Sequence, residues 1–266
     1  MITFESPARD AAHIGEYPRH PITALKAFRK LADDKEDTFQ VFVIIRALSG
    51  RSLAQQYYRL LKDAEGGRQA YLREELAERL QDANWLAQFS DDTVGGTYRA
   101  FLKPRNLTAY GLAEESRRLD EPDIDAAHPI AWYARRQRDI HDIWHVLTGY
   151  STDALGEACV LSFTFGQTGN LALAFLVTGA LIELKRNAWR PPFGRALLEA
   201  WRHGRQAAWL PALDYVALFE MPLVEARARL RLARPVAYER VPPEARNGFR
   251  YAADAVVGGE WSRQAV

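Results

Sequence analysis

Residues 141–157 read HDIWHVLTGYSTDALGE, and this stretch decides the fold because two histidines one helical turn apart are followed by a break and a glutamate. His141 and His145 are two of only six histidines in the 266-residue chain. On a helix, at about 100° per residue, His145 lies roughly 40° and Asp142 roughly 100° from His141, so the three side chains share one face. We therefore predict a helix that presents two imidazoles and a carboxylate together.

Glu157 can join this cluster only if the chain reverses direction. On an unbroken helix it would lie about 18 Å beyond the second histidine. Gly149 can end the first helix. Three good N-cap residues for a second helix follow, namely Ser151, Thr152 and Asp153. We predict a helix–turn–helix that carries Glu157 back to the histidines.

Such a clamp would offer two nitrogens and one or two carboxylate oxygens to a single cation. Histidines at i and i+4 recur in metal sites because both rings reach one ion from a rigid base. The ligand set suits zinc, and also iron, manganese or cobalt, with magnesium a further candidate. The sequence therefore predicts a divalent metal site.

Two other interpretations fit the same residues. Arg138 could pair with Asp142 at i,i+4 inside a buried hydrogen-bonded network. A zinc hydrolase also uses two histidines at this spacing, but it usually places a glutamate directly after the first one as general base. This chain has the shorter Asp142 there, which makes a hydrolase the least favoured of the three.

The rest of the chain predicts an all-α fold, a single multi-helix domain over residues 1–266. Apolar residues recur at helical spacing, and no segment alternates with period two for long enough to indicate a sheet. The expected helices include residues 21–34, 36–50, 51–67, 68–80 and 129–148. A short helix after the glycine pair at 95–96 should end at Pro104. The first 85 residues could form a semi-independent helical layer.

Composition narrows the class of protein. With 48% hydrophobic and 26% charged residues, the chain is typical of a folded soluble protein. Its net charge of +1 gives no general field for nucleic acid, so we expect no nucleic-acid partner. Cys159 stands alone, which rules out an internal disulfide and suits a reducing compartment. The N-terminus lacks the pattern of a secretory or transit peptide, so we expect a bacterial-type cytoplasm.

The stretch RDIHDIWHVLTGYSTDALGE (138–157) resembles the His-Asp-x-x-His, eleven residues, Glu signature of the fourth coenzyme Q (ubiquinone) biosynthesis protein, the Coq-four family. Other segments are similar to the same family: DDTVGGTYRAFL, AWYARRQRDIHD, TGALIELKR and DYVALFEMPLVEARARLRL. Together they span residues 90–232, the family-like core. The first 85 residues show no clear match.

The resemblance implies a role in ubiquinone biosynthesis. It makes His141, Asp142, His145 and Glu157 the metal ligands, with zinc the expected ion, and it leaves Asp142 as either a fourth ligand or a catalytic, orienting base. The implied reaction is oxidative decarboxylation of a polyprenylated hydroxybenzoate, in which a hydroxyl replaces the C1 carboxylate. The alternative is a non-catalytic scaffold that binds lipid and organises the other ubiquinone-biosynthesis enzymes.

Residues 158–182 contain no charged side chain over 25 positions, which is long enough to cross a bilayer. The polar run GQTGN (166–170) divides the stretch into two pieces too short to span, so we favour two buried helices. These helices could form plain core. They could also line an apolar lipid-binding cavity, with Phe163 and Phe165 as contacts for a polyprenyl lipid or quinone precursor.

Arginines gather just before the histidines, at Arg135, Arg136 and Arg138. Each could simply pair with Asp139 or Asp142. Arg138 is our candidate to meet a substrate carboxylate, because a guanidinium offers a bidentate fork.

A second group, Arg227, Arg231 and Arg234, shares a helical face at i, i+4 and i+7. It could be an ordinary solvated face, or it could attract anionic lipid or a partner enzyme. With the resemblance, it predicts a cytoplasmic protein peripheral to the inner face of the bacterial membrane. A homodimer is a further expectation.

Overall fold

The computed structural model describes residues 14–34, 37, 39–102 and 127–247. Within these ranges the only β-pairing is an isolated bridge between Thr93 and Pro222, so the predicted all-α fold is confirmed. The helices of the first part are α1 (Pro21–Asp33), α2 (Phe39–Ser49), α3 (Ser52–Lys62), α4 (Ala64–Leu72), α5 (Leu76–Gln81), α6 (Ala83–Ala87) and α7 (Val94–Leu102).

The second part begins with the longer helices and ends with short ones. They are α9 (Pro129–Asp139), α10 (His141–Thr148), α11 (Ala154–Thr168), α12 (Leu171–Asn187), α13 (Phe193–Gln206), the 3-10 helix η3 (Leu210–Ala212), α14 (Tyr215–Phe219), α15 (Leu223–Arg229), α16 (Val236–Glu239) and α17 (Pro243–Arg246).

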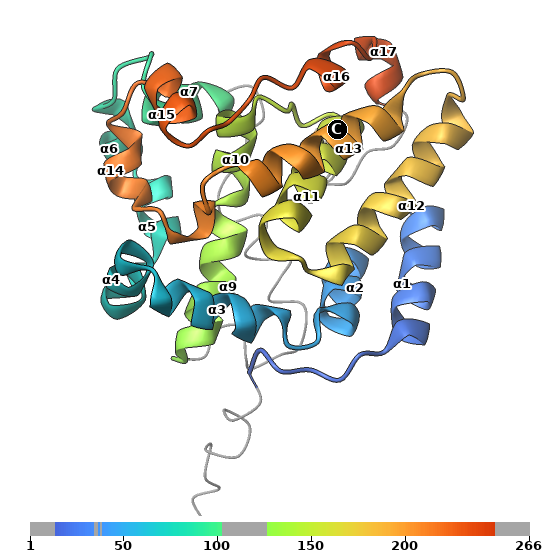
Figure 1. Cartoon of the computed structure of the whole chain (residues 1–266), viewed down its shortest axis with the longest axis horizontal. Helices are drawn as coiled ribbons and strands as arrows, with labels where there is room; N and C mark the ends of the chain where they lie inside the picture. Colours follow the sequence, from blue (N-terminus) through green and yellow to red (C-terminus); the bar gives the residue numbers. More distant parts are fainter. Residues whose placement is uncertain (1–13, 35–36, 38, 103–126, 248–266) are drawn as a thin grey trace, which may run out of the picture.

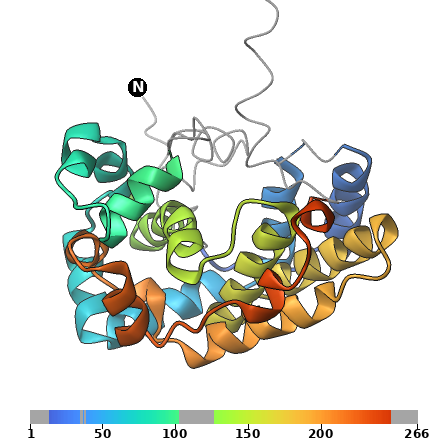
Figure 2. The same ribbon diagram turned by 90° about the horizontal axis from the view of Figure 1, so that it is seen from above.

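Helix α11 is the centre of the arrangement (Figure 1). Helix α13 packs along one side of it and α12 along another, while α2 lies against α12 and α1 against α2. Seen from above, α13 forms the outermost layer on one side of the molecule (Figure 2). The helix that carries Glu157 is therefore enclosed by neighbours along much of its length.

The apolar stretch 158–182 forms two helices, as the polar run GQTGN predicted. Helix α11 ends where Gly169 adopts a positive φ of 67°, and the Asn170 side chain then caps α12 by accepting from the Ala172 N–H. Both helices are core elements, since side chains such as Phe163 and Leu176 are fully buried. Among the described residues, no helix combines the length and apolarity that a bilayer span requires.

The predicted helix over 129–148 is instead divided in two at Ile140, which ends α9 and precedes α10. The division separates two cores. Trp132 and Tyr133 of α9 pack in a cluster with α3 and α4, whereas Trp144 of α10 packs in the main cluster around α11. Helices α9 and α10 thus bury their apolar side chains in different clusters, and the break at Ile140 lies between them. Helix α7 forms as expected, and Pro104 lies outside the described residues.

Candidate metal centre

Three side chains from α10 and α11 converge on one point. The Nε2 atoms of His141 and His145 lie 3.3 Å apart, and each lies 3.3 Å from Oε2 of Glu157. The three potential ligand atoms therefore form a nearly equilateral triangle. The Glu157 and His145 side chains are buried, whereas the His141 side chain is 23% exposed. Of the three side chains, His141 is thus the one in partial contact with solvent.

The reversal between the helices depends on three residues of the turn. Gly149 ends α10 at a φ of 80°, the left-handed conformation that favours glycine. Asp153 then caps α11 by accepting from the Gly156 N–H at 2.8 Å. At Gly156 the backbone passes so close that an added Cβ would lie 1.9 Å from the Ser151 carbonyl oxygen. This tight turn places Glu157 in the first turn of α11.

His145 is oriented by groups outside the triangle. Its Nδ1 lies 3.1 Å from the Tyr150 carbonyl oxygen, an acceptor that places a proton on Nδ1, so in the neutral ring the lone pair is on Nε2, which faces Glu157 and His141. The ring also stacks on Phe101 of α7, with centroids 5.8 Å apart. A backbone partner on the other ring nitrogen is the usual support for a metal-binding histidine.

The charges of the cluster favour a cation. Burial alone would lower the pKa of His145, yet the neighbouring Glu157 carboxylate raises that pKa above its ordinary value. Burial would likewise raise the pKa of Glu157, but the two histidines hold it well below its usual range. Glu157 is therefore a buried carboxylate that stays ionised and needs positive charge beside it.

The triangle also fits the dimensions of a metal site. A tetrahedral ion with bonds of about 2.0–2.1 Å has ligand atoms about 3.3–3.4 Å apart, whereas octahedral ligands at the same bond length lie about 2.9 Å apart. The observed spacing of 3.3 Å matches the tetrahedral case. Thus His141, His145 and Glu157 could hold a metal ion.

Asp142 does not belong to this triangle, whose ligand atoms all lie within 4.8 Å of one another. It is close enough to act on His145 electrostatically, because its charge helps to raise the pKa of that histidine. The structure thus brings three of the four predicted ligands together and leaves Asp142 at the edge.

The arginines before the cluster have structural partners. The Arg138 guanidinium lies 2.9 Å from the buried Asp139 carboxylate, and Arg135 lies 2.5 Å from Glu75. Arg136 is buried and donates to the Leu213 carbonyl. The predicted pairing with Asp139 is therefore present at Arg138.

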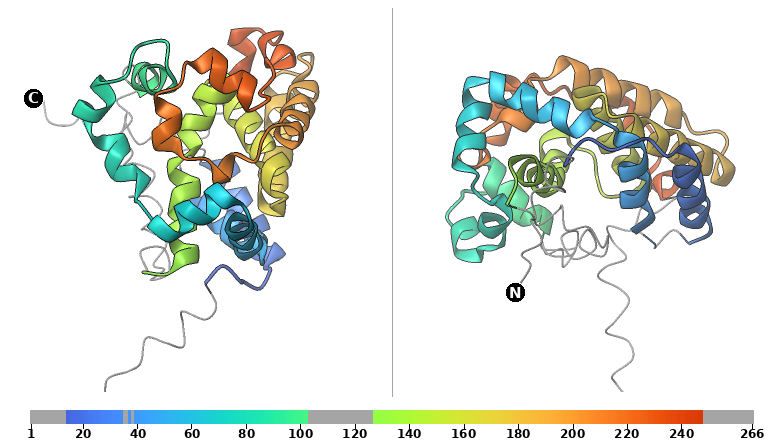
Figure 3. Two further views of the ribbon diagram at one scale, coloured as in Figure 1. Left: turned by 60° about the vertical axis from the view of Figure 1, so that its left-hand side comes forward. Right: turned by 90° about the horizontal axis from the view of Figure 1, so that it is seen from below.

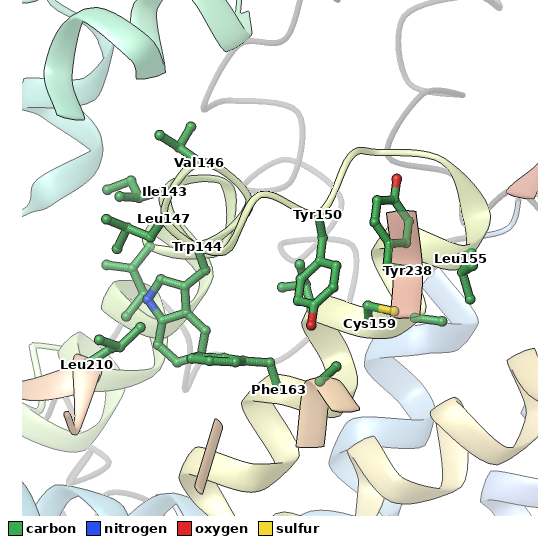
Figure 4. Close-up of a cluster of buried hydrophobic side chains, with 14 of the residues drawn as sticks. Ile143, Trp144, Val146, Leu147, Tyr150, Leu155, Cys159, Phe163, Leu210 and Tyr238 are labelled. Atoms are coloured by element: carbon green, nitrogen blue, oxygen red, sulfur yellow. The ribbon is translucent and has the colours of Figure 1, made fainter. Parts of the chain in front are cut away.

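The two predicted lipid contacts lie in different surroundings. Phe163 is fully buried and meets the Trp144 ring edge to face, with centroids 5.7 Å apart (Figure 4). Phe165 is half-buried and lines a recess of about 450 Å³ at the far end of α11. That recess is about eight residues, or 12 Å of helix, from Glu157.

The sequence did not indicate that Arg227 and Tyr238 support the turn between α10 and α11. Arg227 of α15 donates to the carbonyl oxygens of Leu147 and Val146, at 2.9 and 3.0 Å, at the C-terminal end of α10. The Tyr238 hydroxyl donates to the Asp153 carboxylate and accepts from the Ser151 N–H. No local pattern marks either residue as part of the site.

These contacts correct the predicted arginine face. Arg227 is half-buried and its charge serves the end of α10, while Arg234 pairs with Glu239 at 2.8 Å. Arg231 lies beyond the end of α15, is exposed and adopts a positive φ of 56°. The three side chains therefore do not form a free basic surface.

The fold and the site together define an all-α protein with a candidate three-ligand metal centre between helices α10 and α11. A sequence model of the family described as "Coenzyme Q (ubiquinone) biosynthesis protein Coq4" matches residues 12–236. The chain belongs to this family, so its resemblance to the Coq-four signature is confirmed.

Individual proteins similar to this chain carry the name of the same family. The chain is 27% identical over 177 residues to the mitochondrial ubiquinone biosynthesis protein COQ4 homolog of Rattus norvegicus, covering 65% of this chain and 63% of that protein. It is 25% identical to the Homo sapiens homolog over 198 residues, covering 73% and 71%. The chain therefore spans less than two thirds of the rat protein.

A solved structure has the same fold. The crystal structure of a putative ubiquinone biosynthesis protein from Nostoc punctiforme superimposes with a TM-score of 0.54, covering 80% of this chain and 98% of that one at 21% sequence identity.

Proposed function

We propose that this protein binds a polyprenylated hydroxybenzoate-type intermediate beside a metal held by His141, His145 and Glu157, and that it promotes oxidative decarboxylation of the ring. The observation that carries the proposal is the 3.3 Å triangle of two imidazole nitrogens and one buried carboxylate oxygen. Membership of the ubiquinone-biosynthesis family supports the substrate class.

In the proposed reaction the C1 carboxylate leaves as carbon dioxide and a hydroxyl takes its place, which oxidises the ring carbon and requires an oxidant such as dioxygen. A bound divalent metal would supply a Lewis acid for the carboxylate or phenolate oxygen. Zinc is the expected ion, and magnesium is a further candidate. A redox role would require iron, manganese or cobalt, because zinc keeps one oxidation state.

The residues of the chain have distinct parts in this proposal. Glu157 and the Nε2 atoms of the histidines hold the ion, and the Tyr150 carbonyl fixes the tautomer of His145. Asp142, at the edge of the cluster, is proposed as a fourth ligand or as the base that orients the substrate. Arg138 is proposed to meet the substrate carboxylate, and Phe163 and Phe165 remain predicted contacts for the prenyl chain.

The test uses the purified full-length chain. Metal content is first measured by mass spectrometry, and the metal-loaded protein is then incubated with a prenylated hydroxybenzoate and dioxygen. We expect a decarboxylated, hydroxylated product that His145→Gln abolishes. The matched control is His20→Gln, because His20 is exposed and makes no side-chain cap bond. Equal product from both variants, or none from the loaded protein, would contradict the proposal.

One outcome would favour the alternative function, a lipid-binding scaffold in which the metal only fixes two helices. In that case His145→Gln would leave ring chemistry unaffected in cell extracts but weaken assembly of the other ubiquinone-biosynthesis enzymes. We further propose that the protein acts in the cytoplasm, peripheral to the inner face of a bacterial membrane. The predicted homodimer and the division into an N-terminal layer (1–85) and a core (90–232) stay predictions.

A further inference from the structure

The outward face of α13 carries side chains that the metal centre does not use. Arg195, Arg202 and Arg205 are exposed there, Leu198 is 45% exposed and Trp201 is half-buried. At about 100° per residue, these five positions lie within roughly 120° of one another around the helix. They therefore form one face, called the α13 face below, which carries both cationic and apolar side chains.

The positive charge of this face is not neutralised within the described part of the chain. No ion pair involves Arg195, Arg202 or Arg205 there, and Arg205 instead lies over the Trp201 ring at 5.5 Å. The one acidic residue of α13, Glu199, is half-buried and accepts from the Ala237 N–H at 2.8 Å. The face is thus cationic without an acidic counterpart of its own.

Aromatic side chains flank the α13 face at both ends. Trp189, in the loop before the helix, is 78% exposed and is followed by the exposed Arg190. At the other end, Trp201 and Arg205 line the 450 Å³ recess together with Trp209 and Arg59, whose guanidinium lies 4.2 Å from the Trp209 ring centroid. No acidic residue lines this recess.

The position of α13 in the fold makes this face available. Its opposite side, including Ala196 and Ala200, is buried against α11, and the helix forms the outer edge of the molecule (Figures 2 and 3). A partner that binds the α13 face therefore contacts a helix that packs directly against α11, the helix that contains Glu157.

We propose that the α13 face docks on the surface of an anionic lipid bilayer. Unpaired arginines are attracted to an anionic surface and bind phosphate through bidentate hydrogen bonds. Exposed tryptophans next to them are typical of the interface between head groups and acyl chains. An acidic protein would satisfy the arginines, but it would leave the exposed Trp189 and Leu198 without an apolar environment, so the bilayer is favoured.

The inference rests on the peripheral membrane location proposed above. It assigns the contact with the membrane to the α13 face, in place of the arginines at 227, 231 and 234. It does not depend on the metal, since no ligand of the triangle belongs to α13. Failure of vesicle binding would therefore leave the decarboxylation proposal standing, and absence of ring chemistry would leave the docking surface standing.

The experiment is co-sedimentation of the full-length protein with vesicles of phosphatidylcholine alone or with one third phosphatidylglycerol. Each arginine near an anionic surface strengthens binding about fivefold. Arg195→Gln, Arg202→Gln and Arg205→Gln together should thus weaken partition into the anionic vesicles about 100-fold. The matched control, Lys26→Gln with Arg29→Gln and Lys30→Gln, removes the same charge from exposed positions of α1.

We expect the α1 variant to bind nearly as well as the unmodified protein, and 0.5 M salt to abolish most of the binding because it screens exposed charges. Trp189→Ala should weaken binding several-fold and leave its salt dependence unchanged. Since all these positions are exposed, circular dichroism and metal content should match the parent. Equal loss in the α1 variant, equal binding to neutral vesicles, or no binding by the parent would overturn the proposal.

Discussion

Helices α10 and α11 supply all three atoms of the metal triangle, whereas the segment of α15 and α16 supplies none and yet holds the turn between those helices at both ends. Arg227 satisfies the carbonyls where α10 stops, and Tyr238 binds Asp153 where α11 starts. These partners are 80 and 85 residues apart in sequence. The comparison teaches that a site can take its ligands locally and its rigidity from a distant segment.

The largest effect should come from the ligand side. Glu157→Gln keeps the shape of the side chain but removes its charge, so we expect the metal affinity to fall at least about 100-fold, measured by competition with a chelator. Asp142→Asn is the matched change one position from the triangle. If Asp142 acts from outside the ligand set, its loss should be smaller, about 10-fold to 100-fold. Equal losses would make Asp142 a true ligand.

The next effect tests the turn itself. Gly156→Ala introduces a Cβ that would lie 1.9 Å from the Ser151 carbonyl oxygen, and the backbone has to move to accept it. We expect unfolding to become easier by about 2–3 kcal/mol, together with weaker metal binding, because the shift displaces Glu157. Gly194→Ala, where nothing lies near the added atom, is the control for thermal unfolding. A Gly156 variant as stable as this control would show that the turn tolerates a side chain.

A smaller loss is expected from the distant segment. Arg227→Met keeps the aliphatic stem but removes two hydrogen bonds from a charged group to the end of α10, which should cost about 2 kcal/mol. Arg231→Met, four residues later and exposed, should change the free energy of unfolding by less than about 0.5 kcal/mol. Chemical denaturation of both variants decides the matter, and similar values would remove Arg227 from the support of the site.

The smallest effect should be that of Tyr238→Phe, which removes one hydroxyl from the start of α11. Because that hydroxyl donates to Asp153 and accepts from the Ser151 N–H, we expect a loss of about 1 kcal/mol. Tyr71→Phe, at a side chain that is 84% exposed, provides the reference. If Tyr238→Phe destabilises the protein no more than Tyr71→Phe does, Arg227 alone stabilises the turn.

The sequence alone determined the all-α class, the two helices of the apolar stretch, and the reversal at Gly149 that brings Glu157 to the histidines. These features depend on neighbours within about 20 residues, through helical periodicity, a left-handed glycine and an N-cap, so local rules were sufficient.

Only the tertiary structure decided how the turn is held and which arginines are free. Arg227 and the arginines of α13 look alike in sequence, because a guanidinium is equally suited to a buried helix end and to an exposed surface. Their roles follow from which helix each one packs against. Packing between segments some 80 residues apart depends on the shape of the whole core, and no short pattern encodes that shape.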